Sequence, residues 1–113
     1  MSHVAGESQA RTLSAMNTMT IADLRTNRAA ILEIAARNGA RNLRIFGSVA
    51  RGDATRSSDV DMLVEMEPGR SLLDLSGLVL DLEDLLGCHV DIVTEKTLHP
   101  RIKQRVLADA ASL

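Results

Sequence analysis

The stretch that decides the fold of this chain is FGSVARGDATRSSDVDMLV, which runs from residue 46 to residue 64. It joins the end of one short apolar run to the start of another through a polar and charged loop at residues 48–58. Asp59 and Asp61 stand two positions apart at the start of the second run. Side chains alternate along a strand, so both carboxylates are expected on the same face.

A third carboxylate, Asp91, lies in the later β-favouring run HVDIVT at residues 89–94. Carboxylates crowded on one face repel each other unless a cation lies between them, and Mg²⁺ takes carboxylate oxygens while leaving positions open for phosphates. Gly47 and Ser48 end the first apolar run, and backbone N–H groups that follow such a turn suit phosphate oxygens. Together these residues predict a site that handles a nucleotide.

Composition excludes several classes of function. The chain has 113 residues, which is the size of one domain. Phe46 is its only aromatic residue, so base stacking on aromatic side chains is not available. The net charge of −2 argues against sequence-independent binding to a phosphate backbone. We therefore expect no direct binding of nucleic acid.

The cellular setting is read from cysteine usage and from hydropathy. Cys88 is the only cysteine, so an internal disulfide is impossible and a reducing cytoplasm is the simplest compartment. We expect a small buried or half-buried thiol there, without a catalytic role. No run of about 18 apolar residues is present, so no membrane span is expected. The N-terminal sequence does not read as a signal peptide.

Hydrophobic periodicity and turn residues predict alternating helices and strands. We expect a flexible tail over residues 1–18 and one domain over residues 19–113, the first helix of which opens with a Thr20–Asp23 capping box. This order favours a small α/β (α+β) layer fold, with a mixed sheet of about three strands flanked by helices. The expected helices cover residues 21–38, the segment between a Ser71 cap and a Gly87 stop, and about residue 100 onward, and the expected strands cover residues 43–46, 59–65 and 89–94.

The spacing Gly-Ser, ten residues, Asp-x-Asp resembles the DNA polymerase β-like nucleotidyltransferase superfamily. The runs FGSVARGD and SDVD are most similar to its minimal nucleotidyltransferase branch, over about residues 20–110. The resemblance implies the polymerase β-like fold, with Asp59, Asp61 and Asp91 as catalytic residues that ligate Mg²⁺ in a two-metal site. It also implies that Asp91 helps to deprotonate the attacking hydroxyl, and that Gly47 and Ser48 contact the phosphates of ATP.

Each of these residues also has a plainer interpretation. Asp59 and Asp61 could form an exposed acidic edge that discourages strand pairing, and Asp91 could be a surface residue of an edge strand. Ser48 could cap a helix. Arg51 and Arg56 both lie in the intervening loop, and either could neutralise charge on the leaving pyrophosphate. We predict Arg51 for this role.

The minimal branch is typically encoded beside a HEPN-domain ribonuclease toxin. The resemblance therefore implies an antitoxin of a HEPN/MNT toxin–antitoxin pair, of the MntA type. Such an antitoxin transfers AMP from ATP to a tyrosine of the toxin and binds the toxin in a hetero-oligomer. Two alternatives stay open: a non-catalytic antitoxin that neutralises its toxin by binding only, and a small-molecule nucleotidyltransferase. ATP itself is inferred from the family, because no aromatic clamp marks a base pocket.

Overall fold

The structure is a computed structural model that describes residues 19–113, so the tail expected at residues 1–18 lies outside the described residues. The elements along the chain are α2 (Ile21–Thr26), α3 (Arg28–Arg37), β1 (Ala40–Phe46), α4 (Gly47–Arg51), β2 (Val60–Met66), α5 (Leu72–Leu86), β3 (Val90–Thr94), the 3₁₀ turn η1 (Glu95–Thr97), α6 (Pro100–Asp109) and β4 (Ala111–Ser112).

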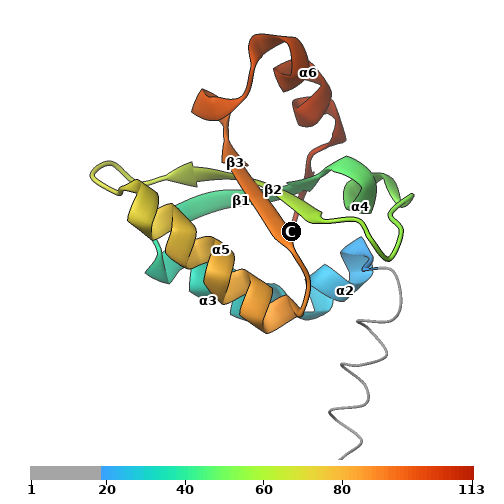
Figure 1. The fold of residues 1–113 in the computed structure, drawn as a ribbon, viewed down its shortest axis with the longest axis horizontal. Helices are drawn as coiled ribbons and strands as arrows, with labels where there is room; N and C mark the ends of the chain where they lie inside the picture. Colours follow the sequence, from blue (N-terminus) through green and yellow to red (C-terminus); the bar gives the residue numbers. More distant parts are fainter. Residues whose placement is uncertain (1–18) are drawn as a thin grey trace, which may run out of the picture.

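A mixed sheet with the strand order β3-β2-β1-β4 forms the middle layer. Helices α3 and α5 cover one of its faces and α6 lies over the other (Figure 1). Strand β1 is antiparallel to β2 and to β4, whereas β2 and β3 are parallel. The expected fold class is confirmed. Within residues 19–113, no helix is both long enough and apolar enough to cross a bilayer.

Two predicted elements differ from the structure. The helix expected over residues 21–38 is divided into α2 and α3 at Asn27, whose side-chain amide donates to the carbonyl of Asp23 at 3.0 Å. Asparagine side chains compete in this way with the backbone bonds of a helix. The fourth strand, β4, is additional, and it pairs Ala111 and Ser112 with β1. A strand of two residues has no periodicity by which the sequence could reveal it.

The aliphatic core lies between the sheet and the pair α3 and α5. Along β2 the side chains of Val60, Met62 and Val64 are fully buried, and they face Leu78 and Leu82 of α5 within the same cluster. Leu63 is buried as well, but the strand alternation places it on the opposite face, which α6 covers. Asp61 shares that second face with Leu63. The sheet therefore separates a stabilising face from a face that carries charge.

A bulge in β1 sets the register at the end of the sheet where the carboxylates lie. Asn42 has a φ of 53°, and the pairing with β2 shifts between Arg41 and Arg44. The side-chain amide of Asn42 donates to Glu65 on β2 at 2.7 Å, which holds the bulge against its partner strand. Asparagine is one of the few residues that adopts this left-handed conformation readily. After the bulge, Phe46 stands opposite Asp61.

The burial along α5 gives a direct test of this core. Leu78 is fully buried and Leu80 is 65% exposed, and both lie in the interior of the same helix. We predict that Leu78→Ala lowers the free energy of unfolding by about 3 kcal/mol, because it leaves a cavity. Leu80→Ala, the control, should change it by less than about 0.5 kcal/mol. Urea unfolding followed by circular dichroism measures both values, and equal losses would contradict the assigned core.

Candidate active site

Two strand ends bring two carboxylates to the same place. Asp61 on β2 is in register with Asp91 on β3, and on its other side it stands opposite Phe46 of β1. Residues paired in register point to the same face of a sheet. Val90 and Ile92, which flank Asp91, are buried in the core on the other face. Asp91 is thus neither isolated nor on the far side of the sheet from Asp61.

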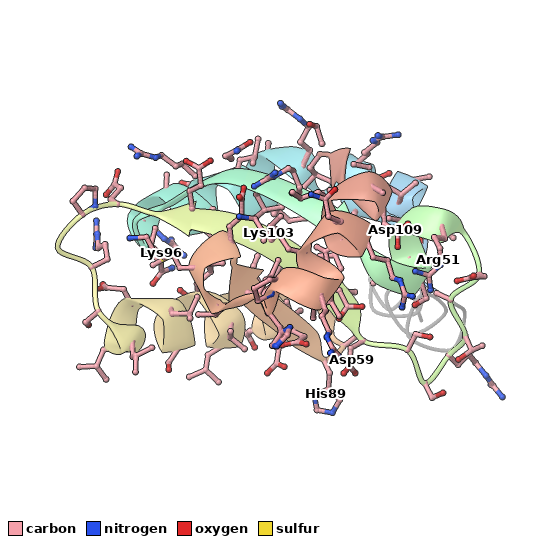
Figure 2. The ribbon with its side chains drawn as sticks, turned by 90° about the horizontal axis from the view of Figure 1, so that it is seen from above. Arg51, Asp59, His89, Lys96, Lys103 and Asp109 are labelled. Carbon is pink, nitrogen blue, oxygen red and sulfur yellow. The ribbon has the colours of Figure 1, made fainter. Side chains whose placement is uncertain are left out.

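Asp59 lies just outside the strand that the sequence predicted for it. Strand β2 begins at Val60, so Asp59 is the exposed residue immediately before the ladder. The N–H of Val60 donates to the carbonyl of His89 at 3.0 Å, and this bond holds the start of β2 against the start of β3. Figure 2 shows Asp59 and His89 at these adjacent strand ends. Asp59 therefore borders the Asp61–Asp91 pair.

The electrostatics of Asp61 show that its carboxyl group feels the charges of the other two carboxylates. Its side chain is half-buried, and its pKa is raised from the usual 3.8 to about 6. Burial is the largest cause, followed by the negative charges of Asp91 and then Asp59. The positive charge of Arg51 acts in the opposite direction. We call Asp59, Asp61 and Asp91 the carboxylate cluster.

The carboxylate cluster fits a hard divalent cation by the chemistry of its donors. Its oxygens are the ligands that Mg²⁺ prefers. Burial, and after it the charges of Asp91 and Asp59, raises the pKa of Asp61, and a cation would offset those charges. Within the described part of the chain, no three His, Cys, Asp or Glu side chains have already converged into a metal-binding arrangement.

Gly47 lies directly against the carboxylate cluster. It has a φ of 75°, and a Cβ atom built on it would overlap the Oδ2 atom of Asp61. Only glycine combines that backbone conformation with that close approach. The N-cap position of α4 is Phe46, and Ser48 lies in the first turn of α4. The alternative in which Ser48 acts as a helix cap is therefore wrong.

Arg51, the predicted phosphate ligand, already has two acidic partners. Its Nη1 donates to Asp109 of α6 at 2.8 Å (Figure 2), and its Nε donates to Asp53 at 3.3 Å. These bonds raise the pKa of the guanidinium, the one to Asp109 most. Asp109 is the residue that sequence reasoning missed, because nothing in a spacing of 58 residues links it to Arg51. Arg56, the other candidate, is exposed in the loop before β2.

Cys88 lies near the carboxylate cluster but does not provide a nucleophile. Its thiol is free and half-buried. Burial raises its pKa, and the charges of Glu83 and Asp59 raise it further. A thiol in such a setting stays protonated near neutral pH. The expected unreactive role is consistent with this environment.

Comparison with known proteins places this geometry in a family. The family model described as a nucleotidyltransferase domain matches residues 28–112, so the chain belongs to this family and is a nucleotidyltransferase. MJ0435 of Methanocaldococcus jannaschii, assigned as a protein adenylyltransferase, is 42% identical over 83 residues, which cover 74% of this chain and 89% of that protein. The protein adenylyltransferase MntA of Thermococcus cleftensis is 43% identical over 77 residues, which cover 68% of this chain and 78% of MntA.

Solved structures agree with the family assignment. A structure assigned as a minimal nucleotidyltransferase has a TM-score of 0.76 and 52% sequence identity, and the match covers 84% of this chain and 97% of that one. A toxin–antitoxin structure with AMP-PNP shares the fold, with a TM-score of 0.65 at 23% identity over 76% of this chain and 71% of that one. The resemblance to minimal nucleotidyltransferases drawn from the sequence is confirmed.

Two glycines provide a matched test of the contact at Gly47. Gly47 and Gly52 have φ values of 75° and 83°, but a Cβ at Gly52 would meet no atom within 4 Å. Alanine at either position should destabilise the fold by about 1–2 kcal/mol through left-handed strain. Only Gly47→Ala should also displace the carboxylate of Asp61, which lowers nucleotidyl transfer by about 100-fold. Comparable activity in the two variants would show that the contact is irrelevant to the reaction.

The raised pKa of Asp61 predicts how stability depends on pH. Between about pH 4 and pH 6 the folded state holds a proton that the unfolded state releases, so the Asp61 contribution weakens stability as the pH rises. A change from 3.8 to about 6 corresponds to at most about 3 kcal/mol, and solvent screening of a half-buried group reduces this to about 1 kcal/mol.

Asp61→Asn removes this titration and thus isolates its effect. In metal-free protein, we predict that the variant gains about 1 kcal/mol of stability relative to the unaltered chain when the pH is raised from about 4 to about 7. Urea unfolding at both pH values measures the change. A stability difference that does not vary with pH would disprove the shift.

Proposed function

We propose that this chain is the antitoxin of a HEPN/MNT toxin–antitoxin pair and that it transfers AMP from ATP to a tyrosine of its HEPN ribonuclease toxin. The observation that carries the proposal is the register of Asp61 with Asp91, with Asp59 beside them and Gly47 packed against Asp61. The names of the relatives support it, because they include protein adenylyltransferases, among them MntA. Structural neighbours described as toxin–antitoxin complexes support it further, one of them with AMP-PNP.

Each residue of the site has a role in this proposal. Asp59, Asp61 and Asp91 would hold Mg²⁺, in a two-ion arrangement, which when bound supplies neutralising charge for the phosphates. Gly47 lets the backbone approach the triphosphate, since no Cβ intervenes. Ser48 contacts a β- or γ-phosphate through its hydroxyl and its N–H. The guanidinium of Arg51 offsets the charge that develops on the leaving pyrophosphate.

The transfer itself is a displacement at phosphorus. The tyrosine oxygen of the toxin forms a bond to the α-phosphorus of ATP, and the bond from that phosphorus to the bridging oxygen breaks. Pyrophosphate leaves with the bonding electron pair, and the proton of the tyrosine hydroxyl passes to the carboxylate of Asp91. A carboxylate positioned within reach of the hydroxyl is a competent general base.

The position of the carboxylate cluster suits a macromolecular acceptor. Asp59 and Asp91 are exposed at the end of the sheet, and α4 begins directly beside them. A side chain carried on the surface of another protein can therefore approach the cluster without entering a closed pocket. This feature favours a protein over a small molecule as the acceptor.

The proposal is tested by incubating the chain with its toxin, Mg²⁺ and ATP labelled at the α-phosphate. We predict label on a toxin tyrosine, and a loss of at least about 100-fold for Asp59→Ala, Asp61→Ala and Asp91→Ala, because metal and nucleophile are misplaced together. Asp84→Ala, which removes an exposed carboxylate of α5, should leave labelling unchanged. The chain contains no tyrosine, so tyrosine self-labelling cannot confuse the result. An unlabelled toxin would refute the transferase activity.

One surface feature favours neutralisation by binding as a second candidate. Leu72, Leu73 and Leu80 of α5 are 80%, 83% and 65% exposed, which provides apolar surface for a partner. The double variant Asp59→Ala and Asp61→Ala separates the two candidates in cells that express the toxin. If growth is rescued as well as by the unaltered protein, binding is sufficient. We predict that rescue fails while the complex still forms.

A further inference from the structure

The shortest ion pair among the described residues links two elements that are distant in the sequence. Nη1 of Arg51, the last residue of α4, is 2.8 Å from Oδ2 of Asp109, the last residue of α6. The Asp109 side chain is 23% exposed, whereas that of Asp53, the other partner of Arg51, is 62% exposed. Asp109 is thus the better shielded of the two anchors.

The C-terminal residues that follow Asp109 are tied to other elements of the fold. Two residues beyond it, β4 joins the sheet by pairing with β1. Arg25 donates to the carbonyl of Ser112 at 3.2 Å, and Arg28 donates to the carbonyl of Leu113 at 3.1 Å. The end of α6 is therefore fixed to the sheet and to α2 and α3. A carboxylate on such a support can hold a neighbouring side chain in one position.

Arg51 has less support from its own segment. It ends a helix of five residues, and Asp53 lies only two residues away on the same loop, so that both would move together. The guanidinium is close enough to the carboxylate cluster for its charge to act on Asp61. Its Nε and Nη1 are bonded to Asp53 and Asp109, and Nη2 has no partner among residues 19–113. Nη2 is therefore free to donate to a phosphate oxygen.

We propose that Asp109 is a positioning residue for nucleotidyl transfer: it holds the Arg51 guanidinium beside the carboxylate cluster, with Nη2 available to the triphosphate. This rests on the proposed phosphate-binding role of Arg51. The opposite possibility is that Asp109 competes with the triphosphate for Arg51 and so restrains the enzyme. The two possibilities predict opposite changes in the affinity for nucleotide when the carboxylate is neutralised.

The test compares Asp109→Asn with the matched control Asp53→Asn, which removes the other partner of Arg51. We expect Asp109→Asn to raise the KM for ATP roughly fivefold, as the loss of one partly exposed ion pair allows. The KM for the toxin should stay within about twofold, and Asp109→Glu should restore most of the loss. Asp53→Asn should stay within about twofold of the unaltered protein. An unchanged or lowered KM for ATP in Asp109→Asn would overturn the proposal.

Two further measurements separate this inference from the proposed function. Calorimetric binding of AMP-PNP with Mg²⁺ should weaken roughly fivefold in Asp109→Asn even if the toxin is never labelled. In an Arg51→Ala background, Asp109→Asn should cause no additional loss, because its effect passes through Arg51. An additive loss, or a melting temperature that falls in step with affinity, would show that Asp109 acts only through the stability of α6. If Arg51→Ala binds AMP-PNP normally, the inference fails and transfer to the toxin can still stand.

Discussion

The site depends on the backbone pairing of β2 with β3, which places two carboxylates of like charge next to each other. The parallel ladder between β2 and β3 places Asp61 and Asp91 side by side, and burial, followed by the charge of Asp91, raises the pKa of Asp61. The opposite face of the same strands supplies the compensation, because Val60, Met62 and Ile92 are buried there against helices. A register error of one residue would exchange the two faces, so the aliphatic pattern and the charged pattern specify each other.

The part of the site that the sequence predicted is the part encoded by local spacing. The position of Asp61 on one face of β2 follows from strand alternation, and the close approach at Gly47 follows from glycine geometry, whereas Asp59 lies just before the strand predicted to hold it. The position of Asp91 is harder to predict from the sequence, because its place beside Asp61 depends on which strands pair and in what register. The aliphatic residues around it predicted a strand, and the family resemblance implied its place in the cluster.

The features that sequence reasoning missed depend on contacts between distant segments. The division at Asn27 arises because one side-chain amide competes with the helix backbone. Strand β4 is too short to have a period, and it exists because β1 offers it an edge. The bond from Arg51 to Asp109 spans 58 residues and has no local signature. These features are visible only once the chain is folded, and the bond to Asp109 is one of the two that hold Arg51.

The measurement that tests the carboxylate cluster most directly is the position of a bound cation. Crystals grown with Mn²⁺ and AMP-PNP would reveal the metal by its anomalous scattering. The structure predicts peaks within roughly 2.0–2.6 Å of carboxylate oxygens from Asp59, Asp61 and Asp91, in contact with the triphosphate beside Gly47. Metal bound elsewhere, or bound by Asp59 and Asp61 while Asp91 points away, would contradict the central claim that the two strands build one cation site.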